Sequence, residues 1–261
     1  MRRNITPAGL WREMGVESPD GVDIEVMAYF CGARVNYREL TSCAARIVGK
    51  ESKAIITVDP RTSVERQRFS IAHELGHWVQ DRGQVAVSCR SADLAPFKLK
   101  DFQNDREAAA NRFAVELLMP AHLFREAARN KAITIASAST LAAQFRVSLT
   151  AAAIRLVELG SYPAIVVCSN QQGYRWSWRH PEIPLALRIN RIISKHSVAQ
   201  NLHMNADYRA PGPTSVDADE WVSHTNVEDY VVTEDSVRIG RGSVLSLVWW
   251  HDETSLLQFD P

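Results

Sequence analysis

The segment His73-Glu74-Leu75-Gly76-His77 has the form HExxH, and its residue types and spacing could bind a metal ion and use it. In a helix, residues i and i+4 lie on one face, so His73 and His77 would offer two imidazoles to one Zn²⁺. Glu74 is rotated away from that line and can reach a metal-bound water, whose pKa zinc lowers to about 7. We predict Zn²⁺ as the cofactor, with Mn²⁺ as the alternative, His73 and His77 as ligands, and Glu74 as the catalytic general base.

The surrounding sequence favours a helix. Thr62 and Glu65 have the S/T-x-x-E spacing of a capping box, which predicts a helix from there to about Gln80. Apolar residues recur at helical spacing on one side, and Gly76 between the histidines can be buried. HExxH also occurs by chance on polar helix faces, and this helical context is what favours a metal site over that alternative.

A catalytic zinc needs a third protein ligand and one open position, and the next predicted helix, residues 105–119, offers candidates. Glu107 and Asn111 lie one turn apart on one face, and the alanines between them would let this helix approach the HExxH helix closely. Glu116 points to the opposite side, and Asp105 at the helix start suits a capping or dipole role. The spacing therefore favours Glu107 as the third ligand.

The two segments together resemble the ImmA/IrrE family of metallopeptidases. HELGH is followed about thirty residues later by E-x-x-A-N-x-F-A-x-x-L-L-M-P, which begins at Glu107 and ends at Pro120. The resemblance covers about residues 20–158. It implies a gluzincin-like zinc site of His73, His77 and Glu107 with Glu74 as general base, and gives Asn111 a supporting or packing role.

The same resemblance implies a protein substrate. Members of the family cut helix-turn-helix transcriptional repressors in stress or mobile-element switches, so a repressor of this class is the expected partner. It also suggests that the strand predicted at residues 53–60 is an edge strand beside the metal helix, where it would pair with the extended substrate backbone. Taken alone, those residues are typical of an ordinary sheet strand.

The length and the change of pattern near residue 160 predict two domains and an α+β fold. Residues 1–160 would form a mostly helical metallopeptidase domain with a small sheet. Residues 161–261 would form a smaller α+β domain, with an amphipathic helix at 184–196 and a loop at 205–219. This second domain resembles the GAF-like modules of some family members, which implies that it senses a signal or docks the substrate.

Composition excludes several classes. Thirty Lys and Arg balance thirty Asp and Glu, whereas proteins that live on phosphate backbones usually carry a basic surplus. No apolar run approaches the roughly 18 residues of a spanning helix, no secretory signal is evident, and the four cysteines form no CxxC pair. These features predict a cytoplasmic protein that neither enters a membrane nor acts mainly on nucleic acid.

Residues 141–160 imitate a DNA-binding helix-turn-helix. Arg146 stands where that motif has its turn glycine, and the would-be recognition helix offers mainly Leu and Ala, which favours core packing. Two alternatives to a peptidase remain: a DNA-binding regulator with a structural metal, and a module that sequesters a repressor without cutting it. The intact HExxH argues against both, because structural zinc prefers four protein ligands.

Overall fold

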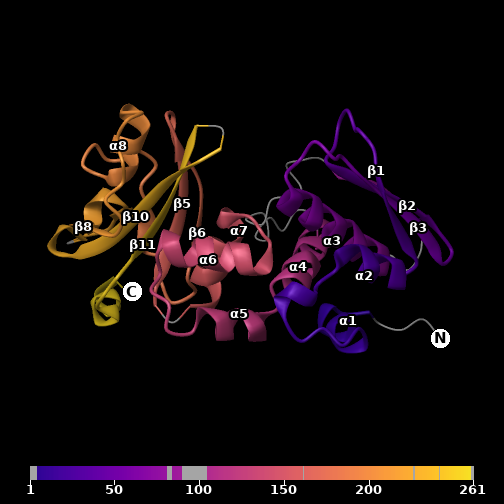
Figure 1. The fold of residues 1–261 in the computed structure, drawn as a ribbon. Helices are drawn as coiled ribbons and strands as arrows, with labels where there is room; N and C mark the ends of the chain where they lie inside the picture. Colours follow the sequence, from indigo (N-terminus) through magenta and orange to yellow (C-terminus); the bar gives the residue numbers. More distant parts are fainter. Residues whose placement is uncertain are drawn as a thin grey trace. The chain divides into compact units, whose positions relative to one another are not determined.

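The computed structural model of the chain is a mixed α+β protein, as the sequence predicted (Figure 1). It describes residues 5–80, 84–89, 105–160, 162–225, 227–240 and 242–259. By compactness the chain divides into an N-terminal unit, residues 1–127 with 142–148, and a C-terminal unit, residues 128–141 with 149–261. No helix in the described part of the chain combines the length and apolar character needed to cross a bilayer.

The elements up to residue 128 hold the HExxH segment. They are α1 (Pro7–Glu13), η1 (Pro19–Gly21), α2 (Ile24–Phe30), β1 (Ala33–Tyr37), β2 (Ala45–Lys50), β3 (Lys53–Val58), α3 (Val64–Gln80), β4 (Gln84–Cys89), α4 (Asp105–Leu118) and α5 (Ala121–Ala128). The sheet has the order β1-β3-β2-β4, with β1 parallel to β3 and the other neighbours antiparallel.

The edge role expected of residues 53–60 is wrong. β3 pairs with β1 on one side and with β2 on the other, so the edges of this described sheet are β1 and β4. Strand β2 was not predicted, since Gly49 and the charged Arg46 weaken its alternation. Strand β4 was not predicted either, because the sequence signals over residues 82–101 are mixed and favour a loop, and residues 90–104 fall outside the described residues.

Helix α3 begins one residue later than the capping box predicted. The Arg66 backbone N–H donates to Ser63 Oγ (3.3 Å), so Ser63 is the capping residue. The Thr62 hydroxyl instead donates to the Asp59 carbonyl (3.0 Å) and closes the turn that precedes the helix. The helix then runs to Gln80 as predicted, and every residue from Arg68 to Trp78 is buried, so this part of the helix is enclosed on all sides.

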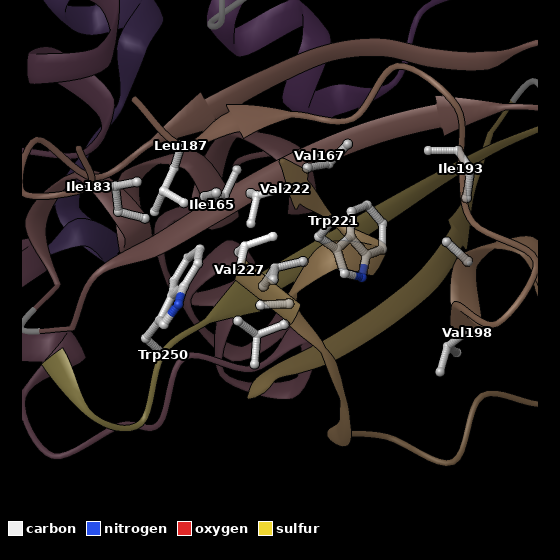
Figure 2. Packing of buried hydrophobic residues seen from close by; sticks show 14 of the residues in the cluster. Ile165, Val167, Ile183, Leu187, Ile193, Val198, Trp221, Val222, Val227 and Trp250 are labelled. Atoms are coloured by element: carbon white, nitrogen blue, oxygen red, sulfur yellow. The ribbon is translucent and has the colours of Figure 1, made fainter. Parts of the chain in front are cut away.

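The rest of the chain builds a five-stranded antiparallel sheet of order β6-β5-β11-β10-β8. Its elements are α6 (Ile135–Phe145), α7 (Leu149–Leu159), β5 (Ala164–Asn170), β6 (Gly173–Arg179), β7 (Arg188–Ile189), α8 (Val198–Met204), β8 (Thr214–Asp217), η3 (Ala218–Glu220), β9 (Val222–Ser223), η4 (Val227–Asp229), β10 (Val231–Ile239), β11 (Ser243–Trp249) and η5 (Glu253–Phe259). Ile165, Val167, Trp221 and Trp250 belong to the buried cluster on one face of this sheet (Figure 2).

The amphipathic helix predicted at residues 184–196 is wrong. That segment consists of turns and the short strand β7, which pairs with β9. The helix of this region is α8, just downstream, and it begins where Ser197 Oγ accepts the Gln200 N–H (3.1 Å). Apolar residues spaced three and four apart occur in irregular chain as well, and Pro184 at the first predicted position is compatible with a helix start, so the sequence pattern did not separate the two.

Helix α7 buries its residues Ala151 to Val157, in agreement with the predicted core packing of this segment. Arg146, in the turn that precedes it, has φ 53°, a left-handed conformation that glycine adopts more easily. The turn thus keeps the backbone geometry of a tight helix-to-helix turn without the glycine. The helix that follows packs against β5 and β6 of its own unit.

Candidate metal centre

The three residues predicted as metal ligands lie together in the structure. Nε2 of His73 is 3.2 Å from Glu107 Oε2, and Nε2 of His77 is 3.2 Å from Glu107 Oε1. The two Nε2 atoms are 3.1 Å apart. Helices α3 and α4 therefore bring the two Glu107 oxygens close to the Nε2 atoms of His73 and His77.

Helix α3 fixes the two histidines. They stand one turn apart, and their rings meet edge to face at 4.7 Å between centroids. Both side chains are buried, at 0% and 1% relative exposure. Burial on a helix of seventeen residues leaves the rings little rotational freedom, so the two nitrogens are held in place before any ligand arrives.

Glycine at position 76 lets α4 come close enough to deliver Glu107. A Cβ placed there would lie 3.0 Å from Ala110 Cα, 3.1 Å from its carbonyl oxygen and 3.2 Å from Phe113 Cβ. These separations are shorter than ordinary van der Waals contact, so a larger residue would push the two helices apart. The expected close approach at the alanines of α4 is therefore confirmed, and Gly76 is the other half of it.

Two residues that the sequence analysis missed hold α3 on the sheet. The indole N–H of Trp78, next to His77, donates to the Cys31 carbonyl (2.8 Å). Its ring covers Gly49 of β2, where any Cβ would overlap the indole. A glycine in mid-strand paired with a tryptophan after HExxH was the available signal, because strand glycines often mark a close approach.

Asn111 orients His73. Its Oδ1 lies 2.9 Å from His73 Nδ1, so the amide oxygen accepts and Nδ1 carries the proton. In the neutral ring this leaves the lone pair on Nε2, the atom that faces Glu107 and His77. Burial lowers the pKa of His73, and the hydrogen bond with Glu107 opposes this only in part, so the neutral form is favoured. The supporting role is thus the one that Asn111 plays in this geometry.

Glu107 is the one partly exposed member, with 24% of its side chain accessible. Burial raises the pKa of its carboxyl, but the hydrogen bonds with His73 and His77 outweigh burial and bring the pKa well below its usual value. The group is therefore a carboxylate. Its exposure leaves one side of the cluster open to solvent.

Glu74 lies beside His73 on α3 and is fully buried, at 0% relative exposure. Of the other candidates, Glu116 Oε2 accepts the Ala121 N–H (3.4 Å) at the start of α5 and lies away from the cluster. The side chain of Asp105 is outside the described residues.

The donor set fits a small divalent cation. In tetrahedral coordination with bonds of about 2.0–2.1 Å, neighbouring ligand atoms are about 3.3 Å apart. The three observed separations, 3.1 to 3.2 Å, approach that value. Among the described residues a second acidic group, Asp217, Asp219 and Glu220, is largely exposed and lacks nitrogen ligands.

Comparison with known proteins adds a family and a fold. Residues 31–157 match the family model described as "IrrE N-terminal-like domain", Peptidase_M78. A solved structure described as "Mycobacterium tuberculosis transcriptional regulator" is similar with a TM-score of 0.60 and 14% identity, over 93% of this chain and 74% of that one. No curated protein sequence matches. The match confirms the expected family for residues 31–157, and the structural likeness extends over both units.

Proposed function

Through its IrrE N-terminal-like domain, residues 31–157, the chain belongs to the ImmA/IrrE family, and we propose that it is a zinc-dependent endopeptidase. The observation that carries this proposal is the meeting of His73, His77 and Glu107 at 3.1 to 3.2 Å, with a general base on the same helix. A buried pair of imidazoles beside a carboxylate, open on one side, is the ligand set of a catalytic zinc site.

The residues would divide the work as follows. His73, His77 and Glu107 hold the metal, which supplies Lewis acidity toward a carbonyl and lowers the pKa of water. Glu74 takes a proton from the attacking water and later gives it to the leaving amine nitrogen. Asn111 keeps His73 in the tautomer whose Nε2 lone pair is free to bind. The peptide bond is hydrolysed without a covalent intermediate on the protein.

The donor chemistry favours Zn²⁺ over Mn²⁺. Two imidazole nitrogens and a single carboxylate suit zinc in four-fold coordination, whereas Mn²⁺ prefers more oxygen ligands in an octahedral arrangement. Among the described residues, no further side chain with a ligating oxygen joins the cluster. In the proposed state, Glu107 would supply one oxygen, so that a position stays open for water.

The proposed substrate is a cytoplasmic regulatory protein, specifically a helix-turn-helix repressor whose cleavage works a stress or mobile-element switch. The family supports a metallopeptidase linked to regulation, and the similar structure is described as a transcriptional regulator. The balanced charge of the chain suits an enzyme that acts on a DNA-binding protein better than one that acts on DNA. Residues 161–261 would then sense a signal or dock the repressor.

The test is coexpression of the chain with helix-turn-helix proteins encoded beside it, scored for repressor fragments. Glu74→Gln should retain zinc and lose about 10³-fold or more in cleavage rate, because the amide cannot accept the proton of water. Glu126→Gln, a matched change of an exposed carboxylate, should cleave like the wild type. Fragments that persist with Glu74→Gln would exclude the mechanism, and repressor binding without fragments would favour sequestration.

A further inference from the structure

The C-terminal unit has a cavity of about 430 Å³ between strand β6 and the segment that contains β7. Three guanidinium groups line it, together with hydroxyl groups. We call it the arginine pocket and define it by Tyr174, Ser177, Arg179, Arg188, Arg191 and Ser223. Nothing in the proposed peptidase reaction uses these residues, since all of them belong to the unit that lacks the HExxH helix.

The strand register directs polar groups toward the core side of the sheet. Arg179 pairs with Ile165, and Ser177 pairs with Val167, in the antiparallel ladder between β6 and β5. Residues directly opposite in such a ladder lie on the same face, and Ile165 and Val167 are members of the buried cluster. Strand β6 therefore places an arginine and a serine where its neighbour places apolar side chains. A sheet edge that only closed the core would carry apolar residues here.

Arg179 is held in position by neutral groups. Its guanidinium donates to the carbonyl oxygens of Pro184 (3.0 Å) and Leu187 (3.1 Å). Burial lowers the pKa of Arg179, although arginine stays charged at any physiological pH. Carbonyl oxygens orient the group and leave its positive charge without a counter-charge. Within the described residues, no ion pair offsets the unfavourable desolvation of the half-buried Arg179 charge.

Arg191 is positioned by Tyr174. Its guanidinium carbon lies 4.2 Å from the centre of the tyrosine ring, and the Tyr174 hydroxyl is 3.0 Å from Ser177 Oγ. The Tyr174 N–H donates to the Arg191 carbonyl (3.2 Å), and Gly173, with φ 108°, lets that carbonyl come close. The far wall of the pocket is therefore tied to β6 before any ligand is present.

The charge of the lining identifies the ligand class. Arg179, Arg188 and Arg191 give three positive charges, and no Asp or Glu lines the cavity. By contrast, the 310 Å³ cavity of the N-terminal unit sets three carboxylates against the guanidiniums of Arg68 and Arg146. That cavity is balanced by its own residues, whereas the arginine pocket is not.

We propose that the arginine pocket binds a small molecule that carries a phosphate group. Three guanidiniums match a dianion with three terminal oxygens better than a carboxylate with one charge. The volume lies in the range of small-ligand sites, about 300–1,000 Å³, and the three arginines line one cavity, which suits a small ligand better than a nucleic-acid backbone. The C-terminal unit would thus detect a phosphorylated metabolite.

The experiment titrates the full chain with phenyl phosphate by calorimetry, with sodium chloride added to constant ionic strength. We expect saturable binding at one site per chain. The double variant Arg188→Ala/Arg191→Ala should bind about tenfold more weakly or worse, because it removes two exposed charges and leaves backbone pairing intact. The control Arg129→Ala/Arg209→Ala loses the same charge from exposed positions outside the lining and should stay within about twofold of the wild type.

Three results would overturn the proposal. The first is the absence of saturable binding, and the second is equal binding by the wild type and the pocket variant. The third is equal heat from sodium acetate, which would mean that any small anion suffices. A short DNA duplex serves as the last probe: if it binds, fails to bind the pocket variant and is not displaced by phenyl phosphate, the surface is a nucleic-acid interface instead. None of these readouts depends on the metal centre, so the proposed peptidase activity can stand or fall separately.

Discussion

Two buried polar clusters, one in each unit, differ in what completes them. In the C-terminal unit, Glu234 is fully buried, and four donors reach its two oxygens: the N–H groups of Val198 and Ala199, the indole of Trp221 and the hydroxyl of Ser236. In the N-terminal unit, the Glu107 carboxylate lies 3.2 Å from the Nε2 atoms of His73 and His77, which are 3.1 Å from each other. The neutral His73 ring, whose Nδ1 donates to Asn111, has no proton on Nε2 to give to Glu107. A carboxylate surrounded by four donors needs no further ligand, whereas a carboxylate beside an unprotonated imidazole nitrogen is stabilised when a cation lies between them.

The contrast shows which observation separates a buried charge with a structural role from one in a functional site. Burial and pKa shifts occur in both clusters, so neither distinguishes them. What distinguishes the two clusters is whether the atoms around the carboxylate are all hydrogen-bond donors. Glu234 anchors the first turn of α8 to the sheet, and its partners are the unsatisfied N–H groups that every helix start presents. His73, His77 and Glu107 cap no helix in this way.

We expect the largest change from removing one of the three candidate zinc ligands. His77→Ala should weaken zinc binding by about 10³-fold, about 4 kcal/mol, because it removes one of three protein ligands. Competition with a chromophoric chelator measures the affinity. His122→Ala, at an exposed position on α5, is the matched control and should bind zinc like the wild type. Zinc affinity within about tenfold of the wild type in His77→Ala would mean that these three residues do not form the site.

The next prediction concerns Glu234 and the four donors around it. Glu234→Ala should lower the free energy of unfolding by about 3 kcal/mol, because it removes the acceptor of the Val198, Ala199 and Trp221 N–H groups, whereas the Ser236 hydroxyl can still donate to Ser246. Urea unfolding followed by tryptophan fluorescence measures the loss, and Glu228→Ala at an exposed site is the control. Zinc affinity should be unchanged. A loss below about 1 kcal/mol would show that the donors find other partners.

The pH dependence of the same pair sharpens the result. Burial raises the pKa of Glu234 above the ordinary value of 4.5, and its hydrogen bonds with Ser236 and the α8 backbone offset only part of this. A raised folded-state pKa contributes stability that is full below the unfolded value and declines as the pH rises through the folded one. The stability difference between wild type and Glu234→Ala should therefore shrink as the pH is raised from 4.5 toward neutrality. A difference that grows would reverse the assignment.

Gly76→Ala should separate the two helices that form the metal cluster. The added methyl would meet Ala110 and Phe113 at 3.0 to 3.2 Å, so we expect a loss of about 2 kcal/mol in unfolding free energy and weaker zinc binding. The control is Gly240→Ala, where a Cβ meets open space in the described structure. If Gly76→Ala binds zinc like the wild type and is equally stable, the close approach of α3 and α4 is not needed.

The smallest effect concerns the support of His73. Asn111→Ala should weaken zinc binding by about tenfold, because the ring loses the acceptor that fixes its tautomer. Asn111→Asp keeps an acceptor and should restore most of the affinity. Chelator competition gives the affinity, and urea unfolding of the metal-free protein shows whether stability has changed. Equal zinc affinity in Asn111→Ala would leave Asn111 a packing residue only.

The sequence could predict the features that depend on residues close together along the chain. HExxH on a helix needs only the helical period, and Glu107 follows from facing positions on the next helix. The sheet order depends on β2 and β4, whose pairing joins segments that local patterns do not connect. Helix α8 has seven residues and is completed by Glu234, which lies 36 residues away from Val198, so no local signal announces it. The arginine pocket likewise appears only after the register of β5 and β6 is known.

The path of the chain between the two units affects how the molecule can be divided. Because it passes from one unit to the other three times, near residues 127, 141 and 148, no single cut releases a whole unit. A cut after residue 160 would strip α7 of β5 and β6, the strands that cover it, and expose its buried alanines. A protease that nicks the chain there would produce two incomplete fragments. Experiments on the metal-site helix α3 and on the arginine pocket should therefore use the whole polypeptide.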